Sequence, residues 1–60
     1  MAVVCTYEER EEGEVVSTGR MTLEGPPAVG DTLRLGRRPV RVEDILPVGR
    51  DEIRLVLQRL

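Results

Sequence analysis

Apolar side chains along this chain recur mostly at every second position, and glycine, proline and aspartate separate the runs. Such alternation is typical of strands that bury one face, whereas an amphipathic helix repeats its apolar residues every three to four positions. Val3, Cys5 and Tyr7 alternate near the start, and Leu33 and Leu35 alternate in the middle of the chain. The pattern therefore predicts an all-β protein.

The first half of the chain predicts two strands joined by a charged connection. The first strand begins at residue 3, and a run of charge at 8–13 interrupts it. This run could begin a helical turn, but like charges crowd it and Gly13 ends it, so we interpret it as a solvated hairpin connection. The second strand covers residues 14–23. Gly19 lies in its middle, which predicts a bulge or a sharp bend there.

The second half predicts three more strands. A turn at Gly30-Asp31 leads into the strand that contains Leu33 and Leu35, and residues 36–39 form a tight hairpin. In the following strand Val40 and Val42 point inward. Ile45 then breaks the alternation, and a bulge near residues 43–44 would restore it.

The last predicted strand follows a loop at residues 47–51 and is apolar on both faces. Ile53, Leu55 and Leu57 point inward, but Val56 and Leu60 fall on the opposite face. A strand of this kind is either covered within its own barrel or buried against another copy of the chain. Val56 and Leu60 are therefore the candidate residues for self-association.

Five short strands at spacings of about ten residues predict a small five-stranded barrel or roll, SH3-like or translation-barrel-like. Residues 1–60 form one domain without repeats or linkers. A domain of this length buries only about 60% of the surface of its unfolded chain, so its core is small. The single Cys5 cannot close an intrachain disulfide. We therefore expect additional stability from self-association, as a homo-oligomer.

Two segments resemble a known family of barrels. Residues 15–21 read VVSTGRM, Gly25 follows, and residues 29–33 read VGDTL. This order resembles the opening of the second-domain β-barrel of translational GTPases such as elongation factor Tu, where Val-Val-Thr-Gly-Arg-Val is followed by a glycine and by Val-Gly-Asp before a strand. The resemblance covers about a third of the chain and implies barrel-like geometry, but a shared fold does not carry function with it.

The residues that support catalysis are scarce. The chain has no histidine, which is the usual acid and base at neutral pH, and Cys5 has no base beside it in any motif. The carboxylates of residues 8–12 are expected to be solvated, and no glycine-rich loop has phosphate-binding spacing. We therefore predict no catalytic, cofactor-binding or metal-binding residue, and no enzyme.

Charge is distributed unevenly along the chain. Six of the eleven acids lie in residues 1–30, whereas seven of the nine arginines lie in residues 31–60. If residues 36–39 form a hairpin tip, two arginines project from one outer face and two lie at the end, where four guanidinium groups could clamp phosphates or an acidic partner. These candidates are Arg34, Arg37, Arg38 and Arg41.

Other features weigh against nucleic acid. The net charge is −2, and Tyr7 is the only aromatic residue, so a platform for base stacking is missing.

The sequence thus predicts a non-enzymatic interaction module that self-associates or binds a protein partner. The alternative is an RNA-binding accessory protein of the translation apparatus that uses the arginine hairpin. A third interpretation joins the acidic turn of one copy to the arginine hairpin of another, which predicts salt-sensitive association. No stretch has the length of a membrane span or the charge of a secretory signal, so we expect a cytoplasmic protein without a membrane partner.

Overall fold

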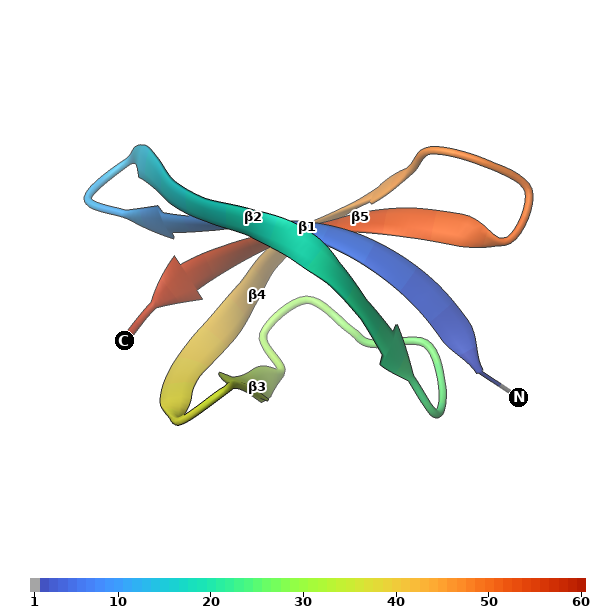
Figure 1. Ribbon diagram of the computed structural model, residues 1–60, viewed down its shortest axis with the longest axis horizontal. Coiled ribbons are helices and arrows are strands. Elements are labelled where there is room, and N and C mark those ends of the chain that lie inside the picture. The colour runs from blue at the N-terminus through green and yellow to red at the C-terminus, as the bar shows by residue number, and fades with distance from the viewer. Residues whose placement is uncertain (1) are drawn as a thin grey trace.

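Five strands make up the computed structural model, which describes residues 2–60 (Figure 1). No helix occurs in this part of the chain, and so none that could cross a membrane. The all-β prediction and the number of strands are confirmed. The strands are β1 (Val3–Glu11), β2 (Glu14–Leu23), β3 (Thr32–Leu35), β4 (Arg38–Pro47) and β5 (Glu52–Arg59).

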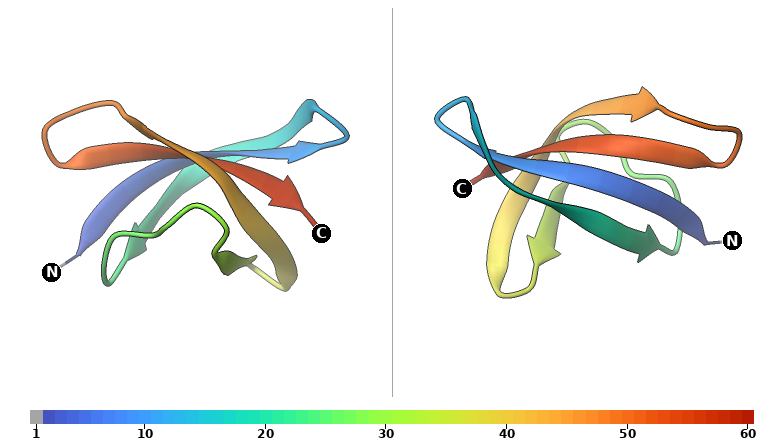
Figure 2. Two further views of the ribbon diagram at one scale, coloured as in Figure 1. Left: turned by 180° about the vertical axis from the view of Figure 1, so that it is seen from behind. Right: turned by 45° about the horizontal axis from the view of Figure 1, so that its top comes forward.

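The strands form a single sheet in the order β2-β1-β5-β4-β3. Neighbours are antiparallel except β1 and β5, which run parallel and bring the two ends of the chain into the middle of the sheet. The sheet curls into a half-barrel whose two edges are β2 and β3 (Figures 1 and 2). The predicted barrel-like architecture is therefore present, but the two edge strands do not pair with each other, so the sheet does not close.

Both tight hairpins have the backbone that their sequences favour. Glu12 and Gly13 have φ values of 53° and 84°, as the type I′ turn requires at both of its central positions. Gly36 has a φ of 67° at the first position of the Gly36-Arg37 turn, which is the glycine position of a type II′ turn. The turn predicted at residues 36–39 is confirmed, although β4 already begins at Arg38.

The inner face of the sheet holds the hydrophobic core. Strand register places apolar residues opposite each other there: Cys5 faces Ile53, and Leu57 faces Val42. The inward prediction for the last strand is confirmed by this register. The completely or almost completely buried core side chains are Cys5, Val40, Val42, Leu55 and Leu57.

One predicted bulge is present and the other is misplaced. The register of β4 against β5 shifts between Val42 and Asp44, as predicted. Of the bulge or sharp bend predicted at Gly19, the bulge is wrong, because the register of β2 instead shifts opposite Glu9 and Arg10. Gly19 lies opposite Tyr7, and a Cβ atom there would lie 2.6 Å from the Tyr7 Oη. The glycine therefore makes room for the tyrosine ring.

Val56 lies on the outer face of β5, yet it is only 8% exposed. Because β5 is the central strand, Val56 has Glu8 of β1 on one side and Asp44 of β4 on the other. Burial within the chain thus accounts for this residue, and little of its surface is left for a partner. Leu60 is 61% exposed at the end of the chain.

Candidate functional site

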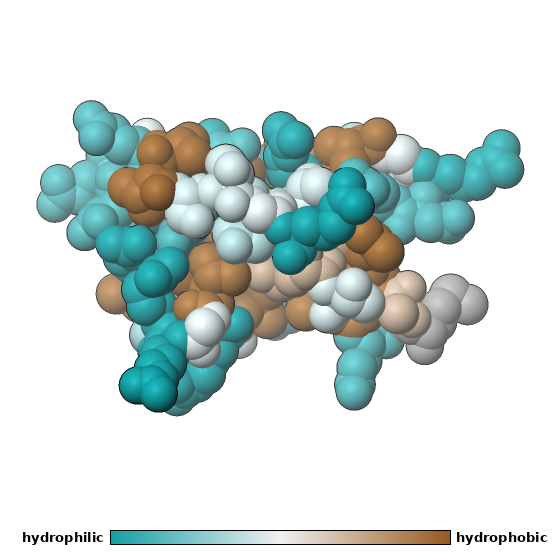
Figure 3. Space-filling model, viewed as in Figure 1, coloured by the Kyte–Doolittle hydropathy of each residue, from teal (hydrophilic) through white to brown (hydrophobic). Residues whose placement is uncertain are grey.

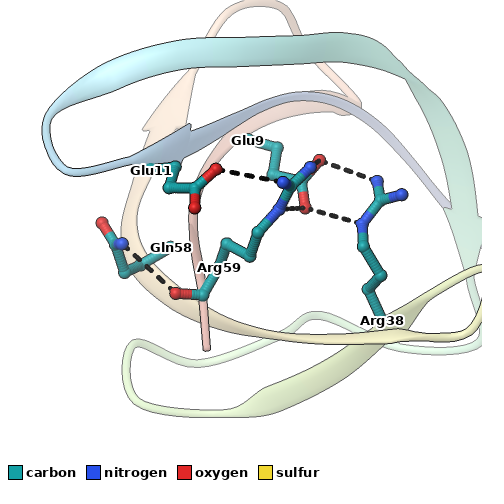
Figure 4. A network of polar contacts seen from close by, with 5 residues as sticks. All are labelled: Glu9, Glu11, Arg38, Gln58 and Arg59. Carbon is teal, nitrogen blue, oxygen red and sulfur yellow. Dashed lines mark hydrogen bonds and ion pairs between the residues drawn. The ribbon is translucent and has the colours of Figure 1, made fainter.

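A buried carboxylate lies at one end of the half-barrel (Figure 4). Glu9 follows Cys5 and Tyr7 at the same alternation on β1, so its side chain enters the inner face and is completely buried. An isolated buried carboxylate would be strongly unfavourable, and two guanidinium groups compensate it. They belong to Arg38 at the start of β4 and Arg59 at the end of β5.

Both arginines bind the Glu9 carboxylate with two nitrogens each. Arg38 Nη2 donates to Oε1 at 2.9 Å and Arg38 Nε donates to Oε2 at 3.3 Å. Arg59 Nε donates to Oε2 at 3.2 Å and Arg59 Nη2 to Oε1 at 3.3 Å. Arg59 Nη1 also donates to Glu11 Oε2 at 3.0 Å. We call Glu9, Glu11, Arg38 and Arg59 the ion cluster.

The ion cluster keeps Glu9 charged. The hydrogen bonds from Arg59 lower the pKa of the Glu9 carboxyl, and those from Arg38 lower it further, which together outweigh the opposing effect of burial. Glu9 in turn raises the pKa of Arg59. Because the four hydrogen bonds to the carboxylate come from within the chain, the cluster fastens β1, β4 and β5 together rather than offering a reactive group.

The ion cluster corrects the interpretation of residues 8–13. They were expected to form a solvated connection, but β1 continues to Glu11, and only Glu12 and Gly13 form the turn. The alternation of β1 already assigns Glu9 to the inner face. Two arginines can satisfy a carboxylate at an inward position, and this outweighs the crowding of like charge.

The structure divides the four arginines of the predicted hairpin. Arg34 and Arg41 are exposed on the outer face, as predicted, because each follows a residue of the inner-face pair Leu33 and Val40. Arg41 also forms an ion pair with Glu43 at 3.3 Å. Arg37 lies in the turn, whereas Arg38 lies on the inner face and belongs to the ion cluster.

A second polar feature, which sequence reasoning missed, lies on the outer face of β2, β1 and β5. Thr6 is paired with Arg20 on one side and with Arg54 on the other. These side chains line a groove of about 520 Å³, together with Glu8, Val15 and Thr18 among others. We call it the arginine groove. No local motif marks it, because three strands distant in sequence supply its residues.

Cys5 and the acids form no further site. Cys5 is completely buried, as predicted for a small apolar residue, and burial raises the pKa of its thiol, with a further contribution from Glu52. Within residues 2–60 no three potential metal ligands come together.

Comparison with known proteins does not extend this picture. No family model, curated protein or solved structure matches the chain. The resemblance of residues 13–35 to the translational barrel stays a prediction. Function is therefore argued from the residues and the fold.

Proposed function

We propose that the protein is a non-enzymatic interaction module that associates with itself through the free edge of β2. Among the described strands, β2 hydrogen-bonds to β1 alone along its ten residues. The outer N–H and C=O groups of such an edge are a template for another strand. The opposite edge, β3, has only four residues, so β2 offers the longer template for a partner.

Apolar side chains add to this edge. Val15 and Val16 are 52% and 46% exposed at the start of β2. Figure 3 shows hydrophobic surface at this end of β2, beside the β1–β2 hairpin. When two β2 edges pair, their backbone N–H and C=O groups form hydrogen bonds with each other, and the same contact removes both valines from water. Exposed Leu60 remains a proposed additional contact.

Salt is expected to have little influence on this association. The third interpretation of the sequence joined acids of one copy to arginines of another. Glu9 and Glu11 already bind Arg38 and Arg59 of their own chain. Pairing at the edge of β2 uses backbone hydrogen bonds and apolar contact, which salt screens weakly.

Lysine at positions 15 and 16 is expected to abolish the association. Two charges on the edge cannot be desolvated when the strands pair, and lysine is a residue that natural edge strands use to prevent pairing. Sedimentation velocity at micromolar concentration should show the unsubstituted protein above the 6.7 kDa of one chain and Val15→Lys/Val16→Lys at that mass.

The matched control is Val29→Lys, which changes a valine that is 63% exposed in the loop between β2 and β3. This variant should associate as the unsubstituted protein does. A monomeric unsubstituted protein would refute self-association. If association survives the double substitution but is lost in Leu60→Asp, the interface lies at the C-terminal Leu60 and not at β2.

The second candidate function is RNA binding by an accessory protein of the translation apparatus. One observation favours it: Arg34 and Arg37 are exposed, and neither has a carboxylate within ion-pair distance in residues 2–60. Two unpaired guanidinium groups at one hairpin are available to phosphate oxygens. The resemblance to the translational barrel supports the same setting.

Arg37→Glu is expected to weaken binding of a fluorescent single-stranded RNA several-fold, because a phosphate contact is lost and a repulsion is added. Fluorescence anisotropy at two salt concentrations measures the affinity and its salt dependence. Arg50→Glu makes the same change of charge in another loop and should alter the affinity little. Equal losses in both variants, or no binding by the unsubstituted protein, would refute a specific role of the hairpin.

A further inference from the structure

Three polar side chains form a row across the outer face of the sheet. Thr6 of β1 lies in the middle, paired with Arg20 of β2 and with Arg54 of β5. Since adjacent strands lie about 4.8 Å apart, the two arginine backbones are separated by about 10 Å, with the threonine between them. Both guanidinium groups can therefore reach the space above Thr6.

Neither arginine of the row is committed to an acid. Ion pairs in the described part of the chain use Arg10, Arg38, Arg41 and Arg59 only. Arg54 Nε donates weakly to Thr6 Oγ1 at 3.4 Å.

The acid that lines the same groove is held by an arginine outside the row. Glu8 also lines the arginine groove, and it is bound by Arg10 at 2.7 Å. Within residues 2–60 neither Arg20 nor Arg54 has a carboxylate within ion-pair distance, although Glu52 lies two residues before Arg54 on the same face of β5.

The row lies in a hollow of suitable size. The sheet twists so that the β1–β2 hairpin and the β4–β5 hairpin rise at opposite ends of its outer face (Figures 1 and 2). The groove between them has a volume of about 520 Å³ and includes the hydroxyl group of Thr18. Pockets that hold small organic molecules have volumes of about 300–1,000 Å³.

We propose that the arginine groove binds one phosphate group of a small molecule, above Thr6 and between Arg20 and Arg54. Each guanidinium can donate two parallel hydrogen bonds to phosphate oxygens, and this geometry matches phosphate better than that of lysine does. The Thr6 hydroxyl donates a further bond. This site uses the outer face of the sheet, so it goes beyond the proposed self-association at the edge of β2.

The surroundings favour a single phosphate over a strand of nucleic acid. The groove continues past Arg20 into a second hollow of about 540 Å³, which is lined by Asp51 and Glu52 as well as Arg50. Those carboxylates repel a second phosphate. Tyr7 also lines the groove, but its ring is packed against Gly19. The chemistry therefore fits a compact phosphorylated compound.

Inorganic phosphate and pyrophosphate are the probes, titrated into the full chain at constant ionic strength. Nuclear magnetic resonance of the arginine Nε–Hε groups and of the backbone amides reports the site. Saturable shifts are expected at Arg20, Arg54 and Thr6. Arg54→Gln should weaken the affinity about tenfold, since a hydrogen bond to a charged group is lost. Arg34→Gln, the matched control on the same face of the sheet, should leave it unchanged.

Thr6→Val provides a second variant that keeps the strand-forming shape and removes only the hydroxyl group. It should weaken binding about threefold if the hydroxyl donates to phosphate. Shifts that do not saturate, that spread over all arginines, or that Arg34→Gln reduces equally would overturn the proposal. So would a single-stranded RNA that binds at Arg20 and Arg54 more tightly than pyrophosphate, because the site would then belong to nucleic acid.

Discussion

Replacing Glu9 with glutamine is expected to lower the free energy of unfolding by about 2–3 kcal/mol. The amide keeps the volume of the side chain but leaves Arg38 and Arg59 without their common carboxylate. Breaking a fully buried pair costs about 3–5 kcal/mol, and the smaller loss follows because both arginines retain access to water. A 60-residue domain has a stability of about 3–9 kcal/mol, so urea denaturation followed by circular dichroism should resolve the change.

The same variant should flatten the acid limb of the stability profile. Because the pKa of Glu9 is lowered by folding, its contribution is complete above the ordinary value near 4.5 and is lost as the pH falls through the folded-state value. Glu9→Gln has no such contribution to lose. Glu12→Gln, in the exposed turn, is the control. If stability depends on pH in the same way in Glu9→Gln and Glu12→Gln, the ion cluster contributes nothing to the acid dependence of stability.

Most of the fold follows from local pattern. The alternation of Ile53, Leu55 and Leu57 assigns the inner face of β5 without knowledge of any neighbour, since side chains on a strand point to opposite faces in turn. The break at Ile45 locates the bulge of β4 for the same reason. Such features depend only on residues adjacent in sequence.

The ion cluster and the arginine groove depend instead on strand pairing. Arg59 reaches Glu9 because β1 and β5 are parallel neighbours, and this pairing leaves no mark in either segment. Arg20 and Arg54 share a row through Thr6 for the same reason. The arginines are visible in the sequence but their partners are not, so the sequence predicts a site only at the local hairpin of residues 36–39.

Leu57→Ala is expected to lower the free energy of unfolding by about 3–4 kcal/mol, because it opens a cavity in a core that is small and completely enclosed at this point. Leu57 has Glu9 beside it on β1 and Val42 beside it on β4. Leu60→Ala removes the same atoms from an exposed site and should cost less than about 0.5 kcal/mol. Urea denaturation of both variants measures the difference.

The position of Leu57 next to Glu9 also predicts how the two substitutions combine. Water admitted by the cavity would screen the carboxylate and weaken its bonds to Arg38 and Arg59. Glu9→Gln should therefore lower the free energy of unfolding less in the Leu57→Ala background than in the unsubstituted protein. The double variant should lose less stability than the two single variants together. Urea denaturation of the unsubstituted protein, both single variants and the double variant in the same concentration of a stabilising osmolyte such as sucrose keeps the double variant folded enough to measure and leaves the ion pairs unscreened. Strict additivity would mean that the apolar core and the ion cluster act independently.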